Sequence, residues 1–149
     1  MAMINKVTSA VTRRMPKMIS PKGHELADFA LTASFLLTGA LFFGRNRRAS
    51  MSALLCAGVG LALTLLTDFD GDGSKPVSFP MHGKVELGVA AMTAALPELM
   101  GFEESRERTA FLLQSGAITA VNNLTDFDRA SGDRRLSDYR VAGRRIRTA

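Results

Sequence analysis

Two short motifs of the same spacing place a histidine and an acid where they can act together. Asp28 follows His24 by four residues, and Glu86 follows His82 by four residues. On a helix this spacing puts both side chains of a pair on one face, within hydrogen-bonding reach. Such pairs can serve as axial ligands to a tetrapyrrole, with the acid orienting the imidazole, or bind a metal ion, or relay protons near neutral pH.

A structural role for the two histidines competes with these functions, and it is the one we expect. Asp68 and Asp126 fall at the ends of apolar segments, where the partial negative charge of a helix C-terminus disfavours an anion. His24 and His82 fall near helix starts, where a protonated imidazole is disfavoured for the corresponding reason. A His24–Asp68 contact and a His82–Asp126 contact between antiparallel helices would offset both penalties. The threonine before each aspartate would satisfy the last free carbonyl groups.

An acidic run after the second apolar segment matches the first half of a calcium-binding loop. Asp68, Asp70 and Asp72 stand at alternate positions before a glycine, as in the D-x-D-x-D-G opening of that loop. The match then fails, because the twelfth position holds Phe79 instead of a bidentate glutamate and two prolines interrupt the exit helix. We therefore expect a solvated acidic turn, with weak calcium binding as the alternative.

One further acid stands inside an apolar segment. Glu98 follows Pro97, and a proline within a helix frees a carbonyl group and bends the helix. We expect Glu98 to reach the polar surface near the helix end, and a buried functional acid is the alternative. The chain contains no nucleophile with its base, phosphate-binding glycine loop or dinucleotide fingerprint, so we expect no enzymatic activity.

Four apolar segments carry these residues, and we expect each to be a helix. They are rich in alanine and leucine and lack the alternation of strands. Each is at the short end of the roughly 20 residues that cross a bilayer, and the second has 19 consecutive residues without a charge. The polar groups of the third and fourth must then face the bundle interior. The segments are residues 26–44, 49–67, 85–102 and 109–125.

The chain repeats itself at an offset of 58 residues. The sequence Leu-Thr-Asp-Phe-Asp at 66–70 recurs unchanged at 124–128, and the two histidines align at the same offset. This predicts two copies of a two-helix unit, at 24–70 and 82–128. Because each copy has an even number of helices, both run in the same direction. The expected fold is an all-α membrane four-helix bundle over residues 23–128, with a pseudo-two-fold axis along the membrane normal.

The basic residues set the expected orientation of this bundle. If the N-terminus lies inside, fourteen of the 19 lysines and arginines lie on the inner side and five on the outer side. Because basic residues are retained on the cytoplasmic side, both termini are expected in the cytoplasm. We expect a multi-pass protein of the bacterial inner membrane.

The two ends of the chain differ from its apolar middle. Residues 1–22 combine apolar residues at helical spacing with basic ones, which predicts a basic amphipathic helix on the membrane surface, with a flexible basic tail as the alternative. The Arg-rich tail at 129–149 has Tyr139 as its single aromatic residue, so we expect contact with anionic lipid or an acidic partner and none with nucleic acid. A disulfide framework is excluded because Cys56 is the only cysteine.

The repeat resembles that of small bacterial membrane proteins with SPW repeats. Each copy in that family opens with a histidine and an acid, as in Met-His-Gly-Lys-Val-Glu at 81–86. Leu-Pro-Glu-Leu-Met-Gly-Phe at 96–102 and Thr-Asp-Phe at 125–127 also resemble the pattern, although this chain has no tryptophan. The resemblance covers residues 22–128 and implies a four-helix inner-membrane fold without an established activity.

These observations predict a non-catalytic integral membrane protein that is an accessory or scaffold subunit of a larger inner-membrane complex. Its expected partners are membrane lipids and other membrane-protein subunits, because small residues are plentiful in the apolar segments and suit close helix packing. No cofactor is expected. Two alternatives remain open: a haem- or chlorophyll-binding subunit that uses His24 and His82, and a small proton-linked channel or transporter that uses Glu86 and Glu98.

Overall fold

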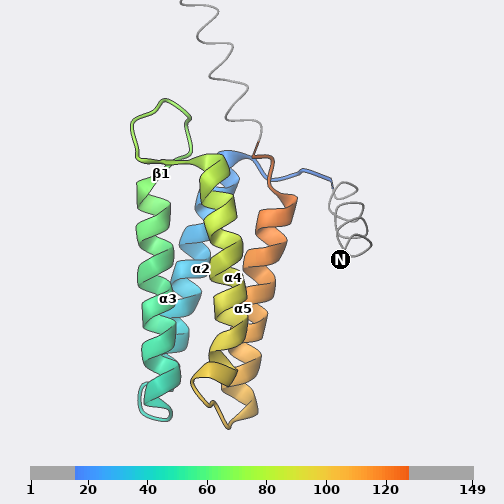
Figure 1. Cartoon of the computed structure of the whole chain (residues 1–149). Coiled ribbons are helices and arrows are strands. Elements are labelled where there is room, and N and C mark those ends of the chain that lie inside the picture. Colours follow the sequence, from blue (N-terminus) through green and yellow to red (C-terminus); the bar gives the residue numbers. More distant parts are fainter. Residues whose placement is uncertain (1–15, 128–149) are drawn as a thin grey trace, which may run out of the picture.

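Four long helices account for most of residues 16–127, the part of the chain that the computed structural model describes. They are α2 (Pro21–Phe42), α3 (Arg47–Leu66), α4 (Phe79–Leu99) and α5 (Ser105–Leu124). Figure 1 shows them side by side as two antiparallel hairpins, α2–α3 and α4–α5. Helix α2 also packs against α5, and α3 against α4. The prediction of an all-α four-helix bundle is thereby confirmed.

Each helix begins before its apolar segment, and in α2 and α3 a capping side chain lies at the start. The hydroxyl of Ser20 accepts the backbone N–H of Gly23, and Pro21 occupies the first helical position, where a missing N–H costs nothing. Helix α3 begins after Asn46, whose side-chain oxygen accepts the N–H of Ala49 at 3.0 Å. The two histidines therefore lie in the first turns of α2 and α4.

Short extended segments tie the start of each hairpin to the end of the other. The two-residue strands β1 (Thr67–Asp68) and β2 (Val77–Ser78) pair in parallel, and a similar bridge joins Ile19 to Thr125. These pairings were not predicted. Residues 16–20 are not helical, so the predicted amphipathic helix does not reach α2. Its residues 1–15, and the Arg-rich tail, lie outside the described residues.

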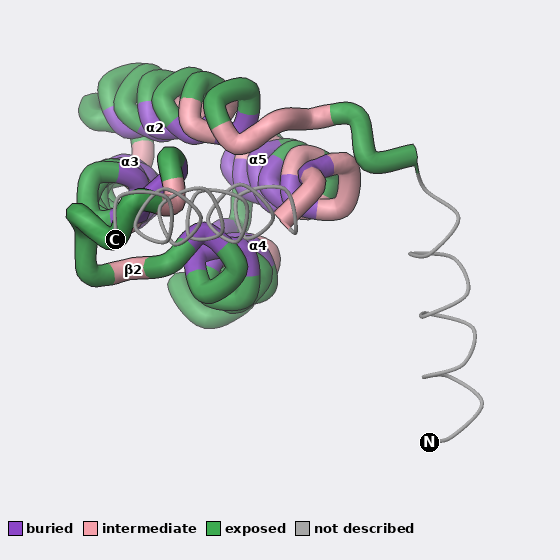
Figure 2. Tube along the Cα trace, turned by 90° about the horizontal axis from the view of Figure 1, so that it is seen from above, coloured by how far each residue is buried: buried purple, intermediate pink, exposed green. Residues whose placement is uncertain are grey.

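The bundle has a polar interior and an apolar exterior. Among the described residues, buried polar and charged side chains outnumber buried hydrophobic ones. Helix α5 is the clearest case, because Gln114, Ser115 and Asn122 are buried while Leu112 and Leu113 are exposed. Figure 2, which looks down the bundle, shows the buried faces of the helices turned toward one another and their exposed faces turned outward.

Helices α2 and α3 are long and apolar enough to cross a membrane. Their mean hydropathy reaches 1.4 and 2.0 respectively over a window of 18 residues. The predicted third and fourth spans are helices α4 and α5, which do not meet that threshold. Their hydropathy is lowered by polar residues that the fold buries, such as Glu86 and Asn122, and by exposed charged residues near the helix ends, such as Lys84.

An apolar core fills the half of the bundle near the hairpin tips. Phe102 and Phe111 are 1% and 0% exposed, with ring centroids 5.2 Å apart. Alanines of α3 let the neighbouring helix approach closely, and the hydroxyl of Ser50 donates to the carbonyl of Gly39 at 2.7 Å. This half of the bundle is packed by side-chain shape, whereas the opposite half is held by polar contacts.

The close approach at Gly39 gives a stability prediction. A Cβ at this position would lie 2.7 Å from Cδ2 and 2.8 Å from Cγ of Leu54, so Gly39→Ala overpacks the α2–α3 contact. We expect the free energy of unfolding to fall by about 1–3 kcal/mol. The matched control is Gly58→Ala, where nothing lies within 4 Å and alanine improves helix propensity. Thermal unfolding in detergent checks both, and equal midpoints would contradict the prediction.

Candidate functional site

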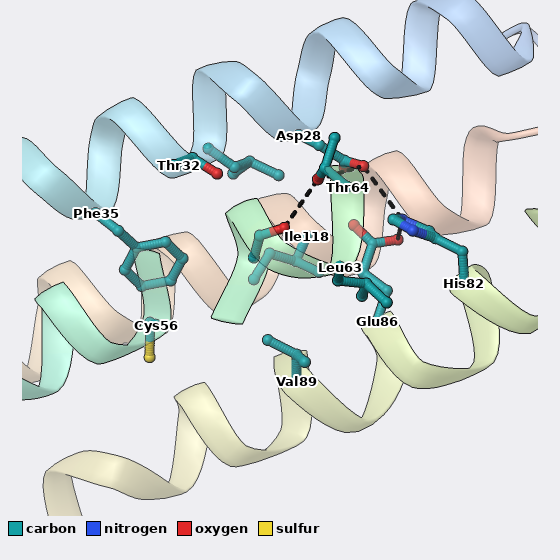
Figure 3. Close-up of a pocket in the computed structure, with 12 residues that line it drawn as sticks. Asp28, Thr32, Phe35, Cys56, Leu63, Thr64, His82, Glu86, Val89 and Ile118 are labelled. Carbon is teal, nitrogen blue, oxygen red and sulfur yellow. Dashed lines mark hydrogen bonds and ion pairs between the residues drawn. The ribbon is translucent and has the colours of Figure 1, made fainter. Parts of the chain in front are cut away.

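The two histidine–acid motifs converge in the interior of the bundle. His24 and Asp28 come from α2, and His82 and Glu86 come from α4. One nitrogen or oxygen atom from each of the four residues lies within 4.8 Å of all the others. The four residues are between 0% and 6% exposed. Figure 3 shows Asp28, His82 and Glu86 of this cluster turned toward one another across the helix interface. We call these four residues the histidine–carboxylate cluster.

Contacts between helices are shorter than contacts within a helix. The two Nε2 atoms of His24 and His82 are 3.1 Å apart. His24 Nε2 lies 3.2 Å from the carboxylate of Glu86, and His82 Nε2 lies 3.2 Å from that of Asp28. The distance from each histidine to the acid four residues later on its own helix is longer, at 3.5 Å for His24 and 4.0 Å for His82. The motifs thus meet the prediction that each acid lies near its own histidine, but each histidine is nearer the acid of the other helix.

The other nitrogen of each imidazole contacts a threonine from the opposite hairpin. His24 Nδ1 lies 2.7 Å from Thr125 Oγ1, and His82 Nδ1 lies 2.8 Å from Thr67 Oγ1. Each hydroxyl donates its single hydrogen to the carbonyl oxygen four residues earlier, at 2.6 Å. It can therefore only accept from the imidazole, which places the hydrogen on Nδ1. The Nε2 atoms face the interior of the cluster, and in the neutral rings they carry lone pairs.

The two carboxylates also have donors of their own. Asn122 Nδ2 donates to Glu86 at 2.8 Å and to the carbonyl of Gly83 at 2.9 Å. Thr64 lies 3.3 Å from Asp28, and its hydroxyl is 2.9 Å from a carbonyl of its own helix. These buried polar residues come from the ends of α3 and α5, so all four helices contribute to the arrangement.

Three phenylalanines enclose the imidazoles on the side of the connecting loop. Phe79 and Phe127 meet the ring of His24 edge-on, with centroids 5.4 Å and 5.5 Å away. Phe69 lies 5.4 Å from the ring of His82 and 5.3 Å from that of Phe79. Because these rings displace water, the charges of the cluster interact in a medium of low dielectric constant.

A small cavity adjoins the cluster on the other side. Asp28, His82 and Glu86 form its polar end, and it extends toward Cys56 and Phe35 (Figure 3). The cavity has a volume of about 30 Å³. This is enough space for about two water molecules. The cluster therefore borders a space large enough for a small exogenous group.

The predicted histidine–aspartate contacts are replaced by the histidine–threonine contacts. Asp68 instead accepts the backbone N–H groups of Gly71, Asp72 and Gly73, at 2.8, 3.2 and 2.6 Å. Asp126 donates its backbone N–H to Ile19 at 3.1 Å. The sequence correctly predicted that the threonine hydroxyls donate to the last free carbonyl groups. It did not predict that the same threonine oxygens accept hydrogen bonds from the histidines.

The acidic loop does not assemble as a calcium site. Both carboxylate oxygens of Asp68 accept backbone N–H groups, so the loop closes on itself. Asp70 reaches Lys22 at 3.6 Å on the surface. Hydrogen bonds from the side chain and the backbone of Ser74 hold the pKa of the Asp72 carboxyl below its usual range. The prediction of a solvated acidic turn fits this loop better than the calcium alternative.

Glu98 is a surface residue. Its side chain is 73% exposed and pairs with the guanidinium of Arg108 at the start of α5. The alternative of a buried functional acid at this position is therefore wrong. A different acid, Glu107, is 3% exposed, and its Oε2 has no hydrogen-bond partner within the described part of the chain. Sequence reasoning did not single it out, because it lies in a charged run.

The cluster geometry also decides against a tetrapyrrole between the two histidines. Two axial imidazoles would have to stand on opposite faces of the macrocycle. Here the Nε2 atoms of His24 and His82 are in direct contact at 3.1 Å, and both side chains are almost fully buried. The four cluster residues can instead hold a single small cation.

Comparison of the chain with family models, curated proteins and solved structures finds no match. The chemistry of the site therefore rests on its own geometry.

The hydrogen bonds predict the tautomer of both imidazoles. His24 and His82 are the only histidines in the chain, so nitrogen-15 labelling of histidine yields two resolvable rings. We expect two-dimensional NMR to detect hydrogen on both Nδ1 atoms. Thr125→Val should perturb the ring of His24 more than that of His82, and Thr67→Val should do the reverse. Hydrogen on Nε2 alone in either ring would contradict this assignment.

Proposed function

We propose that the chain is a multi-pass integral membrane protein and a non-catalytic accessory or scaffold subunit of a larger complex. In this proposal the histidine–carboxylate cluster joins two hairpins at one end of the bundle. The distribution of polar groups is the observation that carries the proposal. A soluble helical bundle hides its apolar side chains and exposes its polar ones, whereas this bundle does the opposite along its middle.

The outer surface of α5 supports the placement of all four helices in lipid. From Leu112 to Ala120 its exposed positions are leucine, glycine or alanine, and its amide and hydroxyl groups point inward. Helix α4 exposes Val85, Leu87 and Met92 over the same depth and buries Glu86. In a bilayer, buried polar groups that bond one another satisfy the requirement that no polar group faces hydrocarbon.

We further infer that the two hairpins are copies of one unit related by a pseudo-two-fold axis along the membrane normal. The support is that three kinds of contact recur when each residue is exchanged for its equivalent 58 positions away. A repeat in the sequence does not by itself require that equivalent residues make equivalent contacts in the structure. The pairs are His24–Thr125 and His82–Thr67, Asp28–Thr64 and Glu86–Asn122, and Ile19–Thr125 and Val77–Thr67. The resemblance to SPW-repeat proteins agrees with this duplication and remains a proposal.

Small residues on the outer surface support a role beside other membrane subunits. Gly58 on α3 and Gly116 on α5 are exposed, and a Cβ on either would meet nothing within 4 Å. Ala62 and Ala120 follow them by four residues on the same exposed faces. Glycine and alanine at this spacing allow another membrane helix to approach closely.

The orientation of the bundle can be tested with single cysteines in a Cys56→Ser background. Ser74 lies in the β1–β2 loop and Glu103 in the α4–α5 loop, both are exposed, and these loops lie at opposite ends of the bundle (Figure 1). With cytoplasmic termini, a membrane-impermeant maleimide should label Glu103→Cys in intact bacterial cells and Ser74→Cys only after lysis. The reverse pattern would refute the orientation, and recovery in the carbonate-soluble fraction would refute membrane insertion.

The scaffold role predicts a specific loss of partners. Gly116→Leu places a large side chain on the exposed small-residue face of α5, where an added Cβ meets nothing within 4 Å. Co-purification of other membrane proteins in gentle detergent should therefore be lost, while the helical circular dichroism is unchanged. Gly44→Leu at the tip of the first hairpin is the matched control, because nothing lies within 4 Å there either. A wild-type chain that purifies alone as a stable monomer would refute the accessory role.

A further inference from the structure

We propose that the histidine–carboxylate cluster binds one divalent transition-metal ion of the zinc class. The ligands are Nε2 of His24, Nε2 of His82 and one oxygen each from Asp28 and Glu86. This site goes beyond the proposed membrane role and does not depend on it, because every ligand lies within the bundle interior.

The separations between the ligand atoms fit a tetrahedral ion. Metal–ligand bonds of about 2.0–2.1 Å, as for zinc with imidazole or carboxylate, place the ligands of a tetrahedron roughly 3.3–3.4 Å apart. The two Nε2 atoms are 3.1 Å apart, and each lies 3.2 Å from the acid of the other helix. His24 lies 3.5 Å from Oδ1 of Asp28, whereas the Asp28 oxygen near His82 is Oδ2, and the contact of His82 with Glu86, at 4.0 Å, is the longest. One atom from each of the four residues lies within 4.8 Å of the others.

The hydrogen inventory of the cluster calls for a cation. The threonine hydroxyls place a hydrogen on Nδ1 of both imidazoles, so in the neutral rings the facing Nε2 atoms carry lone pairs. Two ionised carboxylates add only further lone pairs. The two Nε2 atoms, 3.1 Å apart, and the carboxylate oxygens 3.2 Å from each of them repel one another unless a proton or a metal ion lies between them. One dication supplies the missing attraction and balances the charge of Asp28 and Glu86.

The surroundings of the cluster match those of protein metal ligands. A metal-bound histidine usually has its second ring nitrogen held by a hydrogen bond, and Thr67 and Thr125 provide this. Ligating carboxylates are usually held in the same way, and Asn122 holds Glu86 while Thr64 lies against Asp28. The positions of all four ligands are thus determined by residues outside the cluster.

The ligand types identify the class of ion. Magnesium and calcium prefer six or more oxygen ligands, and two imidazole nitrogens in a four-ligand set disfavour them. Two nitrogens and two oxygens suit Zn²⁺ and its neighbours Co²⁺ and Fe²⁺. Four protein ligands complete a tetrahedral shell, which is typical of a structural ion. Such an ion would join α2 of one hairpin to α4 of the other.

Metal analysis of the full chain tests this site. The chain is purified from membranes in detergent through an affinity tag without histidine, and its bound metals are measured by mass spectrometry. After chelation, Co²⁺ is titrated against the apo chain. We expect one Co²⁺ per chain, a visible absorption band of tetrahedral intensity, and displacement by Zn²⁺. Absence of Co²⁺ and Zn²⁺ binding would show that the cluster holds protons only and would overturn the proposal.

Variants assign the binding to the cluster. Glu86→Gln and Asp28→Asn keep the shape of the ligands and should weaken Co²⁺ affinity by at least about 100-fold, whereas Thr67→Val, which removes a supporting hydrogen bond, should weaken it by about 10–100-fold. Glu98→Gln, an exposed acid on α4, is the matched control and should bind as the wild type. Wild-type affinity in both cluster variants would overturn the proposal.

A measurement on the wild-type chain covers the case in which the cluster variants do not fold. On addition of Zn²⁺ to nitrogen-15 histidine-labelled protein, both Nε2 resonances should shift while both Nδ1 hydrogens remain. Unchanged Nε2 resonances at saturating Zn²⁺ would overturn the proposal. Because metal binding is measured in detergent on the intact chain, its failure is distinct from failure of membrane insertion or of partner binding.

Discussion

Burial of two imidazoles and two carboxylates in one small volume is the constraint around which this bundle is organised. Groups of this kind are costly to remove from water unless each is paired. The fold meets the cost with partners from α3 and α5: threonines at the ends of these helices accept hydrogen bonds from the histidines, and Asn122 and Thr64 lie against the acids. The parallel bridges at Ile19 and Val77 then hold the first turn of each hairpin against the last turn of the other.

The two ends of the bundle are stabilised in different ways. Near the hairpin tips, Phe102, Phe111 and the alanines of α3 pack by shape, and Gly39 leaves room for the side chain of Leu54 between α2 and α3. At the cluster end, directional hydrogen bonds and the three phenylalanines restrict the side chains. A bundle placed in lipid gains little from burying apolar groups, because the surrounding chains are equally apolar. Polar contacts and close packing would then carry a larger share of its specificity than in a water-soluble protein.

Sequence reasoning succeeded where the signal was local or periodic. The four helices follow from apolar segments without strand alternation, and the His24–Asp28 and His82–Glu86 faces follow from a spacing of four. It failed where the partner came from a distant segment. The helix-dipole reasoning chose Asp68 as the partner of His24, but the loop N–H groups take the oxygens of Asp68 and Thr125 takes the imidazole. The sequence left a buried position open for Glu98, but its side chain lies on the surface and pairs with Arg108, which is ten positions away on another helix.

The amino-acid sequence by itself determined which side chains would share a helix face, which apolar segments would be helices, and that equivalent residues recur 58 positions apart. The first two follow from helical periodicity and composition, the third follows from comparing the two halves of the sequence, and none needs knowledge of how the helices pack. Only the tertiary structure decided that the two histidines would meet at 3.1 Å, which acid each would approach, and which nitrogen would carry the hydrogen. Those outcomes depend on the rotation and depth of α2 against α4 and α5, where a shift of one residue would turn His24 away from His82.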